Sequence, residues 1–170
     1  MRFRDKRVLV AGGGSIGPGL GNGKAAAILY AREGAEVLVV DRSLSAAAET
    51  VAEITAEGGT ARPFMGDMTD PEAAAAAVAD AGGPLDVLHF NIGTSVKGGV
   101  VETRPEDWAR VFDINLGAAY HLARAALPGM EAAGKGALVF ISSLAGLRAG
   151  PYSYVSYEAS KAALQRMAQS

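Results

Sequence analysis

Short apolar runs alternate along the chain with longer stretches in which apolar residues recur at helical spacing. The run Val8-Leu9-Val10-Ala11 is compact, apolar and followed by glycines, which is typical of a buried parallel strand. Residues 25–32 have helical spacing and end just before Gly34, and residues 37–40 form the next apolar run. The pattern therefore opens with a strand, a helix and a second strand.

The same alternation continues to the end of the chain. We expect strands at 60–65, 85–90 and 137–141. We expect helices at 43–57, after the N-cap Asp70, from Glu106 to Ala133 behind a capping box that starts at Thr103, and from about Ser156 through Ser170. Strands joined by helices predict right-handed crossovers and a doubly wound α/β fold, a mostly parallel sheet in a single domain over residues 1–170. In such a sheet ligands bind beyond the carboxyl ends of the strands.

Composition narrows the class of protein. With 49% hydrophobic and 20% charged residues, the chain of 170 residues can bury one core. The net charge of -2 and the absence of a Lys/Arg run predict no nucleic-acid partner, and no apolar run is long enough to predict a membrane partner. Because the chain has no cysteine, it can form neither a disulfide nor a thiolate metal site, a pattern that favours a cytoplasmic location.

A glycine-rich segment, residues 12–23, joins the first strand to the first helix. Backbone without side chains can approach a pyrophosphate closely, and the amides at the start of a helix can bind it. A flexible surface loop is the plainer interpretation of the same glycines. Its position between a strand and a helix favours phosphate binding.

Asp41 ends the second strand, where a carboxylate can accept hydrogen bonds from the ribose hydroxyls of adenosine and repel a 2′-phosphate. Asp41 therefore favours NAD as the cofactor. The neighbouring Arg42 could pair with a 2′-phosphate, so NADP stays possible. The plainer interpretation is that Asp41 is a turn residue at the end of a strand.

Four later motifs follow in a fixed order: Asn91-Ile92-Gly93, Asp113-Ile114-Asn115, Ile141-Ser142-Ser143 and Tyr157-x-x-x-Lys161. Together with the glycine loop they resemble the short-chain dehydrogenase/reductase family. Gly17, Gly21 and Gly23 reproduce the spacing of the family's glycines, and Gly12 takes the place at the end of the strand, as though a few residues were inserted between them. The chain departs from the family at Ala11, where a threonine is usual, and at two positions of the family's Asn-Asn-Ala-Gly segment.

The resemblance implies a Rossmann-type NAD(P)-binding domain that lacks the family's C-terminal strands and substrate loop. It implies that Ser143, with Ser142 as the fallback, contacts the substrate, and that Asn115 holds a water of a proton relay. From the residues alone, Asn115 would be an exposed polar residue of a helix. The residues that the resemblance and the loop pattern assign to the cofactor are Gly12, Gly17, Gly21, Gly23, Asp41, Asp67, Met68, Asn91, Gly93, Tyr157 and Lys161.

Tyr157 and Lys161 are four residues apart, which on a helix places the phenol and the ammonium on one face, one turn apart. Such a pair also arises by chance, so the Tyr-Lys spacing is weak evidence alone. The order of all the motifs along the chain is the stronger evidence. An ordinary tyrosine is a poor base at neutral pH, and a nearby positive charge favours the phenolate. By resemblance, Lys161 also binds the hydroxyls of the nicotinamide ribose.

We therefore predict an NAD(P)-dependent oxidoreductase that transfers a hydride between a nicotinamide cofactor and a secondary alcohol or ketone, without a metal. The helices that begin near Glu106 and Ser156 predict a homo-oligomer, because relatives pair subunits through them. The alternative is a catalytically silent dinucleotide-binding or assembly module. His89 and His121 lack ligand spacing and are assigned to packing, whereas Tyr152 and Tyr154 either line the pocket or pack.

Overall fold

The protein is built on a five-stranded parallel sheet. The computed structural model describes residues 1–15, 17, 19–148 and 150–170. The sheet has the order β3-β2-β1-β4-β5, and all four strand pairs are parallel. The strands are β1 (Arg7–Ala11), β2 (Glu36–Asp41), β3 (Thr60–Met65), β4 (Val87–Phe90) and β5 (Ala137–Phe140). This sheet confirms the predicted doubly wound α/β fold, and the order reverses between β1 and β4, which is where such folds bind ligands.

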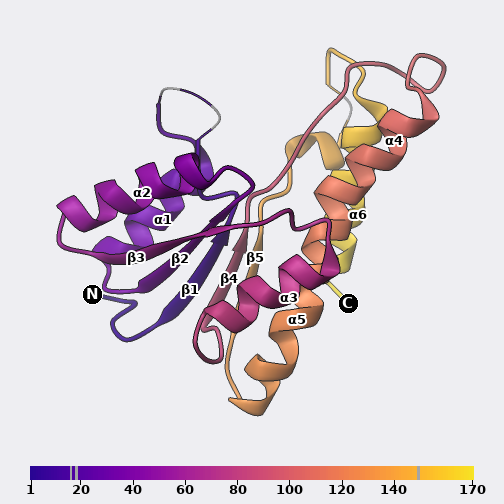
Figure 1. Cartoon of the computed structure of the whole chain (residues 1–170). Helices are drawn as coiled ribbons and strands as arrows, with labels where there is room; N and C mark the ends of the chain where they lie inside the picture. The colour runs from indigo at the N-terminus through magenta and orange to yellow at the C-terminus, as the bar shows by residue number, and fades with distance from the viewer. Residues whose placement is uncertain (16, 18, 149) are drawn as a thin grey trace.

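Helices cover both faces of the sheet (Figure 1). On one face lie α1 (Asn22–Arg32) and α2 (Leu44–Ala56). On the other lie α3 (Pro71–Asp80), α4 (Pro105–Phe112), the π-helical segment Asp113–Gly117, α5 (Ala118–Ala132) and α6 (Val155–Met167). In the part of the chain that the structure describes, no helix is long and apolar enough to cross a membrane.

The core is divided into two layers by the sheet. Along β1, Val8 and Val10 pack with α1 and α2, while Leu9 and Ala11 pack with the helices of the other face. Successive side chains of a strand point to opposite faces, so a strand buried on both faces must be apolar at every position. This explains the unbroken apolar run from which the strand was predicted.

The long helix predicted from Glu106 to Ala133 is divided in the structure. The π-helical segment Asp113–Gly117 lies between α4 and α5 and contains the fully buried Asn115. Single π turns inside α-helices frequently occur at functional sites. The smaller differences lie at element ends: α1 begins at Asn22 instead of Ala25, and α6 ends at Met167, so the expected helix does not reach Ser170.

The predicted capping box at Thr103 is wrong. Arg104, not Thr103, is the N-cap of α4, and no side chain caps the helix. Pro105 explains the difference, because the residue before a proline is driven toward an extended conformation, and Arg104 has φ -70° and ψ 147°. The helix therefore begins one residue later than the box requires, and the buried Oγ1 of Thr103 has no partner among the described residues.

Candidate active site

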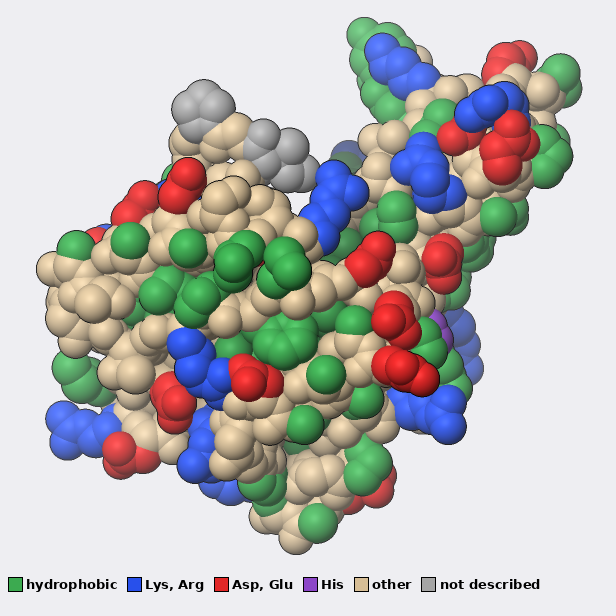
Figure 2. Space-filling view, viewed as in Figure 1, with side chains coloured by type: hydrophobic (Ala, Val, Ile, Leu, Met, Phe, Trp, Pro, Cys, Tyr) green, Lys and Arg blue, Asp and Glu red, His purple; other side chains and the backbone are tan. Residues whose placement is uncertain are grey.

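A groove of about 450 Å³ runs along the carboxyl ends of the strands. Figure 2 shows a hollow between the surface over α1 and α2 and the projection that carries α4 and α6. The loops after β1, β2, β3 and β4 all contribute, as the sequence predicted, whereas no described residue of the loop after β5, which was expected to join them, lines the groove. The lining residues are Gly12, Gly14, Ser15, Gly21, Gly23, Asp41, Arg42, Gly66, Asp67, Met68, Thr69, Asn91, Ile92, Gly93, Thr94, Arg110, Ile114 and Ala118.

Close contact between the start of α1 and the end of β1 requires glycine at Gly23. A Cβ placed there would overlap the carbonyl oxygen of Gly12 and lie 2.8 Å from Nδ2 of Asn91. Gly12 itself has φ +76°, a conformation that side chains disfavour. The structure therefore brings Gly12, Gly21 and Gly23 together at the groove, with Gly21 as the N-cap of α1.

Gly17 does not join them. No atom of the described residues lies within 4 Å of a Cβ built on Gly17, and the lining of the groove does not include it. Ser15 closes the loop at its base instead: its Oγ donates to the carbonyl of Gly19 at 3.2 Å and accepts from the amide of Gly21 at 3.3 Å. Gly17 therefore lies outside the groove lining, and a cofactor contact by Gly17 stays a prediction.

Asp41 lies in the groove and also shapes the local backbone. Its Oδ2 accepts from the amide of Gly14 at 3.1 Å, and its Oδ1 accepts from the amide of Ser43 at 3.0 Å. A carboxylate has about four acceptor positions, so both oxygens can still accept from a ligand hydroxyl. The two interpretations of Asp41, turn residue and ligand-binding residue, are therefore compatible, and Arg42 beside it is exposed.

The loop after β3 brings Asp67 and Met68 into the same groove. Oδ1 of Asp67 accepts from both the amide and the hydroxyl of Thr69, at 3.0 and 2.8 Å, and Met68 is buried in the core. From the loop after β4, Nδ2 of Asn91 lies 3.4 Å from the carbonyl oxygen of Gly12. The sequence thus identified a lining residue after each of these strands.

Asn115 is an internal anchor, and the expectation that it would be an exposed helix residue is wrong. Its Oδ1 accepts from the amide of Thr94 at 2.8 Å, and its Nδ2 donates to the Thr94 carbonyl at 3.0 Å and to Oγ of Ser160 at 2.9 Å. The Ser160 hydroxyl in turn donates to the carbonyl of Tyr157. Both amide hydrogens of Asn115 are used, so one side chain ties the groove wall to the helix that carries Tyr157.

The two candidate serines differ in the hydrogen bonds that they make. Ser142 donates to the carbonyl of Lys161 at 3.0 Å and accepts from Nε2 of Gln165 at 2.9 Å, so it fastens β5 to α6. Ser143 accepts from the amide of Ala145 at 3.1 Å. Among the described residues no acceptor takes the hydroxyl hydrogen of Ser143, which leaves this hydrogen available to a substrate oxygen.

Lys161 is buried beside the groove. Its Nζ donates to the carbonyl of Ile141 at 2.8 Å and lies 5.8 Å from the centre of the Tyr157 ring. A Cβ built on Gly93, which lines the groove, would lie 3.4 Å from this Nζ. Burial lowers the pKa of Lys161. Lys161 therefore lies next to the groove and Tyr157 lies beside Lys161, although neither of them lines it, and Ser143 is not among the lining residues either.

Three groups of residues at the site were not predicted from the sequence. Arg110, Ile114 and Ala118 line the groove at successive intervals of four residues, a helical stripe that the spacing could have revealed. Thr94 and Ser160, the partners of Asn115, gave no local signal because their contacts are long-range. Gln165 holds the segment after β5 and carried no motif.

The histidines pack within the fold. His89 is buried in β4, where Nδ1 lies 3.3 Å from the hydroxyl oxygen of Tyr30, and burial lowers the pKa of His89. The ring of His121 lies edge-on to Tyr120. Across the described ranges, no three His, Cys, Asp or Glu side chains are grouped so that they could hold a metal ion.

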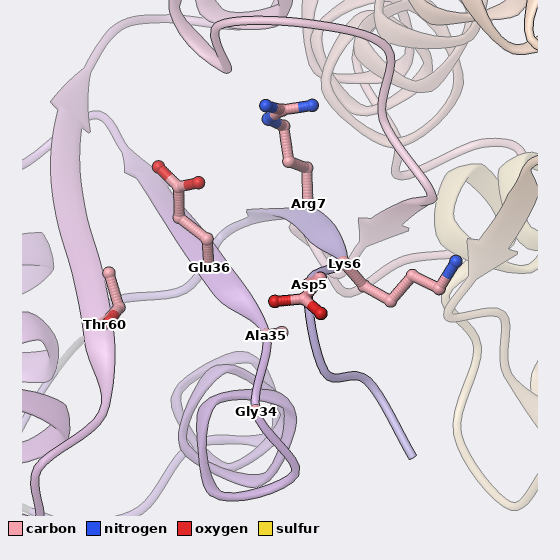
Figure 3. A pocket seen from close by; sticks show the side chains of 7 residues that line it. All are labelled: Asp5, Lys6, Arg7, Gly34, Ala35, Glu36 and Thr60. Atoms are coloured by element: carbon pink, nitrogen blue, oxygen red, sulfur yellow. The ribbon is translucent and has the colours of Figure 1, made fainter. Parts of the chain in front are cut away.

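A second hollow lies at the opposite, amino-terminal edge of the sheet (Figure 3). Two of its charged groups are engaged elsewhere: Lys6, whose side chain points away from Glu36 in this view, pairs with Asp86 at 3.1 Å, and Glu36 lies 3.9 Å from Arg62. These ion pairs fasten neighbouring strands. The hollow therefore has a structural explanation, and the carboxyl-edge groove is the candidate site.

Comparison with known proteins gives matches that cover nearly the whole of this chain. The chain matches the family model for short chain dehydrogenase over residues 6–170. The cyclohexanol dehydrogenase of Acinetobacter sp. (strain SE19) is 37% identical over 150 residues, which cover 86% of this chain and 58% of that protein. A crystal structure described as a short-chain dehydrogenase/reductase from Burkholderia xenovorans is 39% identical with a TM-score of 0.94, covering 98% of this chain and 67% of that one.

A further solved structure was determined with its cofactor. The 3-oxoacyl-(acyl-carrier protein) reductase from Brucella melitensis with bound NAD is 33% identical, has a TM-score of 0.87, and is matched over 98% of this chain and 65% of its own. The chain spans 66%, 58% and 64% of the length of the first three curated relatives. It therefore spans less than two thirds of these relatives.

Proposed function

The chain belongs to the short-chain dehydrogenase family, and we propose that it transfers a hydride between a nicotinamide dinucleotide and a secondary alcohol or ketone. One observation carries the proposal: the buried ammonium of Lys161 adjoins a glycine-floored groove through Gly93, and Tyr157 lies one helical turn away from it. The groove supplies the binding site and the adjoining side chains supply the proton chemistry.

The residues of the groove fit a dinucleotide. The floor at Gly12 and Gly23 has no room for a side chain, which allows backbone to approach a pyrophosphate. Asp41 and Asn91 offer polar groups along the groove, and Asp67 and Met68 extend it past β3. When bound, the nicotinamide ring supplies or accepts the hydride. The name of the cyclohexanol dehydrogenase supports a secondary alcohol as the substrate class.

The proton is handled by the side chains of Ser143, Tyr157 and Lys161. Ser143 donates its uncommitted hydroxyl hydrogen to the reacting oxygen, whereas Ser142 is held by α6. Tyr157 takes up the alcohol proton, and the positive charge of Lys161 favours the deprotonated phenol. Asn115 acts as a positioning residue through Ser160, and a relay water would be held at its backbone, because its amide hydrogens are used.

We propose NAD as the preferred cofactor, because Asp41 places a carboxylate in the groove where a 2′-phosphate would add a second negative charge. Asp41→Ala should shift the ratio of kcat/KM values toward NADP. An unchanged ratio would assign Asp41 to the turn at Ser43 alone. Arg42→Ala is the companion variant, and it should lower kcat/KM for NADP more than for NAD.

The test of the function is Tyr157→Phe in the complete protein. We expect NADH binding to be retained, measured by cofactor fluorescence, and turnover of cyclohexanol and other secondary alcohols to fall by about 10²- to 10⁴-fold. Tyr152→Phe is the matched control, since Tyr152 is 67% exposed and should leave kcat unchanged. Near-normal kcat in Tyr157→Phe would remove Tyr157 from the chemistry. NAD binding without turnover in the wild type would favour the silent module.

We also propose that α4 and α5 form a contact between copies of the chain. Trp108, Tyr120 and Leu127 are large apolar residues that are at least 40% exposed on these two helices. Large exposed apolar groups are typical of subunit interfaces. Mass measurement in solution should give an oligomer, and Tyr120→Glu should dissociate it. A wild-type monomer at micromolar concentration would contradict this proposal.

A further inference from the structure

Arg110 lines the groove although no nucleotide-binding motif includes it. It lies on α4, and the groove-lining residues Ile114 and Ala118 follow it at intervals of one turn. The three therefore form a stripe that begins with a guanidinium and continues with apolar side chains. Ala118 and Met68 belong to the same apolar cluster, so the stripe continues into the part of the groove formed by the loop after β3.

The guanidinium group of Arg110 is hydrogen-bonded along one edge to Asp107. Its Nη2 donates to Oδ1 of Asp107 at 3.1 Å, while Nε of Arg104 donates to the other oxygen, Oδ2, at 2.8 Å. The Asp107 side chain is only 15% exposed, and the hydrogen bonds from Arg104 and Arg110 lower the pKa of Asp107. Figure 2 shows positive and negative side chains gathered over the α4 end of the molecule.

This arrangement has a consequence for recognition. A hydrogen bond to a carboxylate uses the edge of the guanidinium plane and leaves both of its faces free. A planar cation stacks on an aromatic ring through those faces. The arginine is 50% exposed in its side chain, so a ligand ring can reach it. Ile114, one turn further along, offers an apolar surface to the same ring.

We propose that Arg110 is a binding residue for the adenine ring of the cofactor, with its guanidinium stacked on the ring and held in place by Asp107. The inference rests on the proposed function, which places the adenosine ribose of the cofactor at Asp41. It adds a contact from α4, an element that the nucleotide-binding motifs do not include.

The experiment measures the dissociation constant of ADP for the complete protein by isothermal titration calorimetry, at low and at high salt. Arg110→Ala should weaken ADP binding by about three- to thirtyfold, the range expected for a cation–π contact. The loss should persist at high salt, and Arg110→Lys should restore less than half of it, because an ammonium is not planar. Arg104→Ala is the matched control, since Arg104 bonds to the same Asp107 but does not line the groove, and it should bind within twofold of the wild type.

Three results would overturn the inference: unchanged binding by Arg110→Ala, a loss that disappears at high salt, or an equal loss in Arg104→Ala. The second result would mean that Arg110 acts only by long-range electrostatic attraction, which salt screens. The third would mean that Arg110 only stabilises the structure of α4. Arg42→Ala, measured in parallel, shows whether the arginine across the groove carries the stacking instead. Absence of ADP binding by the wild type would refute the proposed function itself, so the two failures are distinguishable.

Discussion

Removing the side chain of Asn115 should destabilise the protein as well as its site. Asn115→Ala deletes three hydrogen bonds, two to the backbone of Thr94 and one to Ser160. Each contributes about 0.5 to 1.5 kcal/mol, so the loss should be about 2 to 4 kcal/mol. Small domains have a total stability of about 5 to 15 kcal/mol, which makes this a large fraction. The loss should also release the groove wall from the helix that carries Tyr157.

The measurement is denaturant unfolding followed by the fluorescence of Trp108, the one tryptophan of the chain. Asp113→Ala, an exposed change in the same π-helical segment, should shift the unfolding free energy by less than about 0.5 kcal/mol. Ser160→Ala should cost about 1 to 3 kcal/mol, because it leaves a buried amide hydrogen of Asn115 unpaired. The double variant should cost less than the sum of the two, by about 1 kcal/mol, since both remove the same bond.

Two results would refute this reasoning. An unfolding free energy of Asn115→Ala within about 1 kcal/mol of the wild type would mean that water replaces the amide at no cost. Strict additivity in the double variant would mean that Asn115 and Ser160 do not share a bond in solution.

Three further changes have defined outcomes. Gly23→Ala should abolish dinucleotide binding in a fluorescence titration and lower the melting temperature, because the added Cβ would overlap the Gly12 carbonyl. Unchanged binding would contradict the close approach of α1 to the end of β1. Burial opposes ionisation of Asp86, but hydrogen bonds from Lys135, the Arg7 amide and Lys6 outweigh it and lower its pKa to about 2, below the ordinary 3.8. The stability from Asp86 is therefore present above about pH 4 and is lost as the pH falls through 2. Asp86→Asn should cost about 1 to 2 kcal/mol at pH 7 and less than about 0.5 kcal/mol at pH 2, measured by unfolding at both. Lys161→Met should raise the unfolding free energy at pH 7 by about 1 kcal/mol, because burial disfavours the charged ammonium, and it should weaken NADH binding. Burial lowers the pKa of Lys161, so the stability advantage of the variant should shrink as the pH rises through that pKa. A loss of stability would show that the hydrogen bond to the carbonyl of Ile141 outweighs burial.

Strands and their ends were predictable because their signals are local. The residues 60–65 form β3 as expected, and the acids Asp41 and Asp67 lie in the groove because the carboxyl ends of parallel strands meet at one edge. The N-cap Asp70 was also correct: its side chain accepts from the amide of Glu72, and Pro71 begins the helix.

The features that could not be predicted depend on partners far along the chain. The burial of Asn115 depends on its bonds to Thr94 and Ser160, which lie 21 and 45 residues away along the chain. No local sequence pattern links the three residues. The capping box failed for a different reason, because two local rules competed and Pro105 prevailed over Thr103. Gly17 does not line the groove, and a cofactor contact by Gly17 stays a prediction.

The contacts of Asn115 explain how the groove and the side chains proposed to react can lie on separate elements. Gly93 and Thr94 belong to the loop after β4, whereas Tyr157 and Lys161 belong to α6, and these segments are not continuous in sequence. A hydride transfer needs the reacting groups to be placed within a fraction of an ångström, so the relation between the two elements must be fixed. Asn115 fixes it by bonding to Thr94 on one side and to Ser160 on the other, from a buried position at the π-helical segment. A surface residue could not do this, because water would compete for each of its bonds.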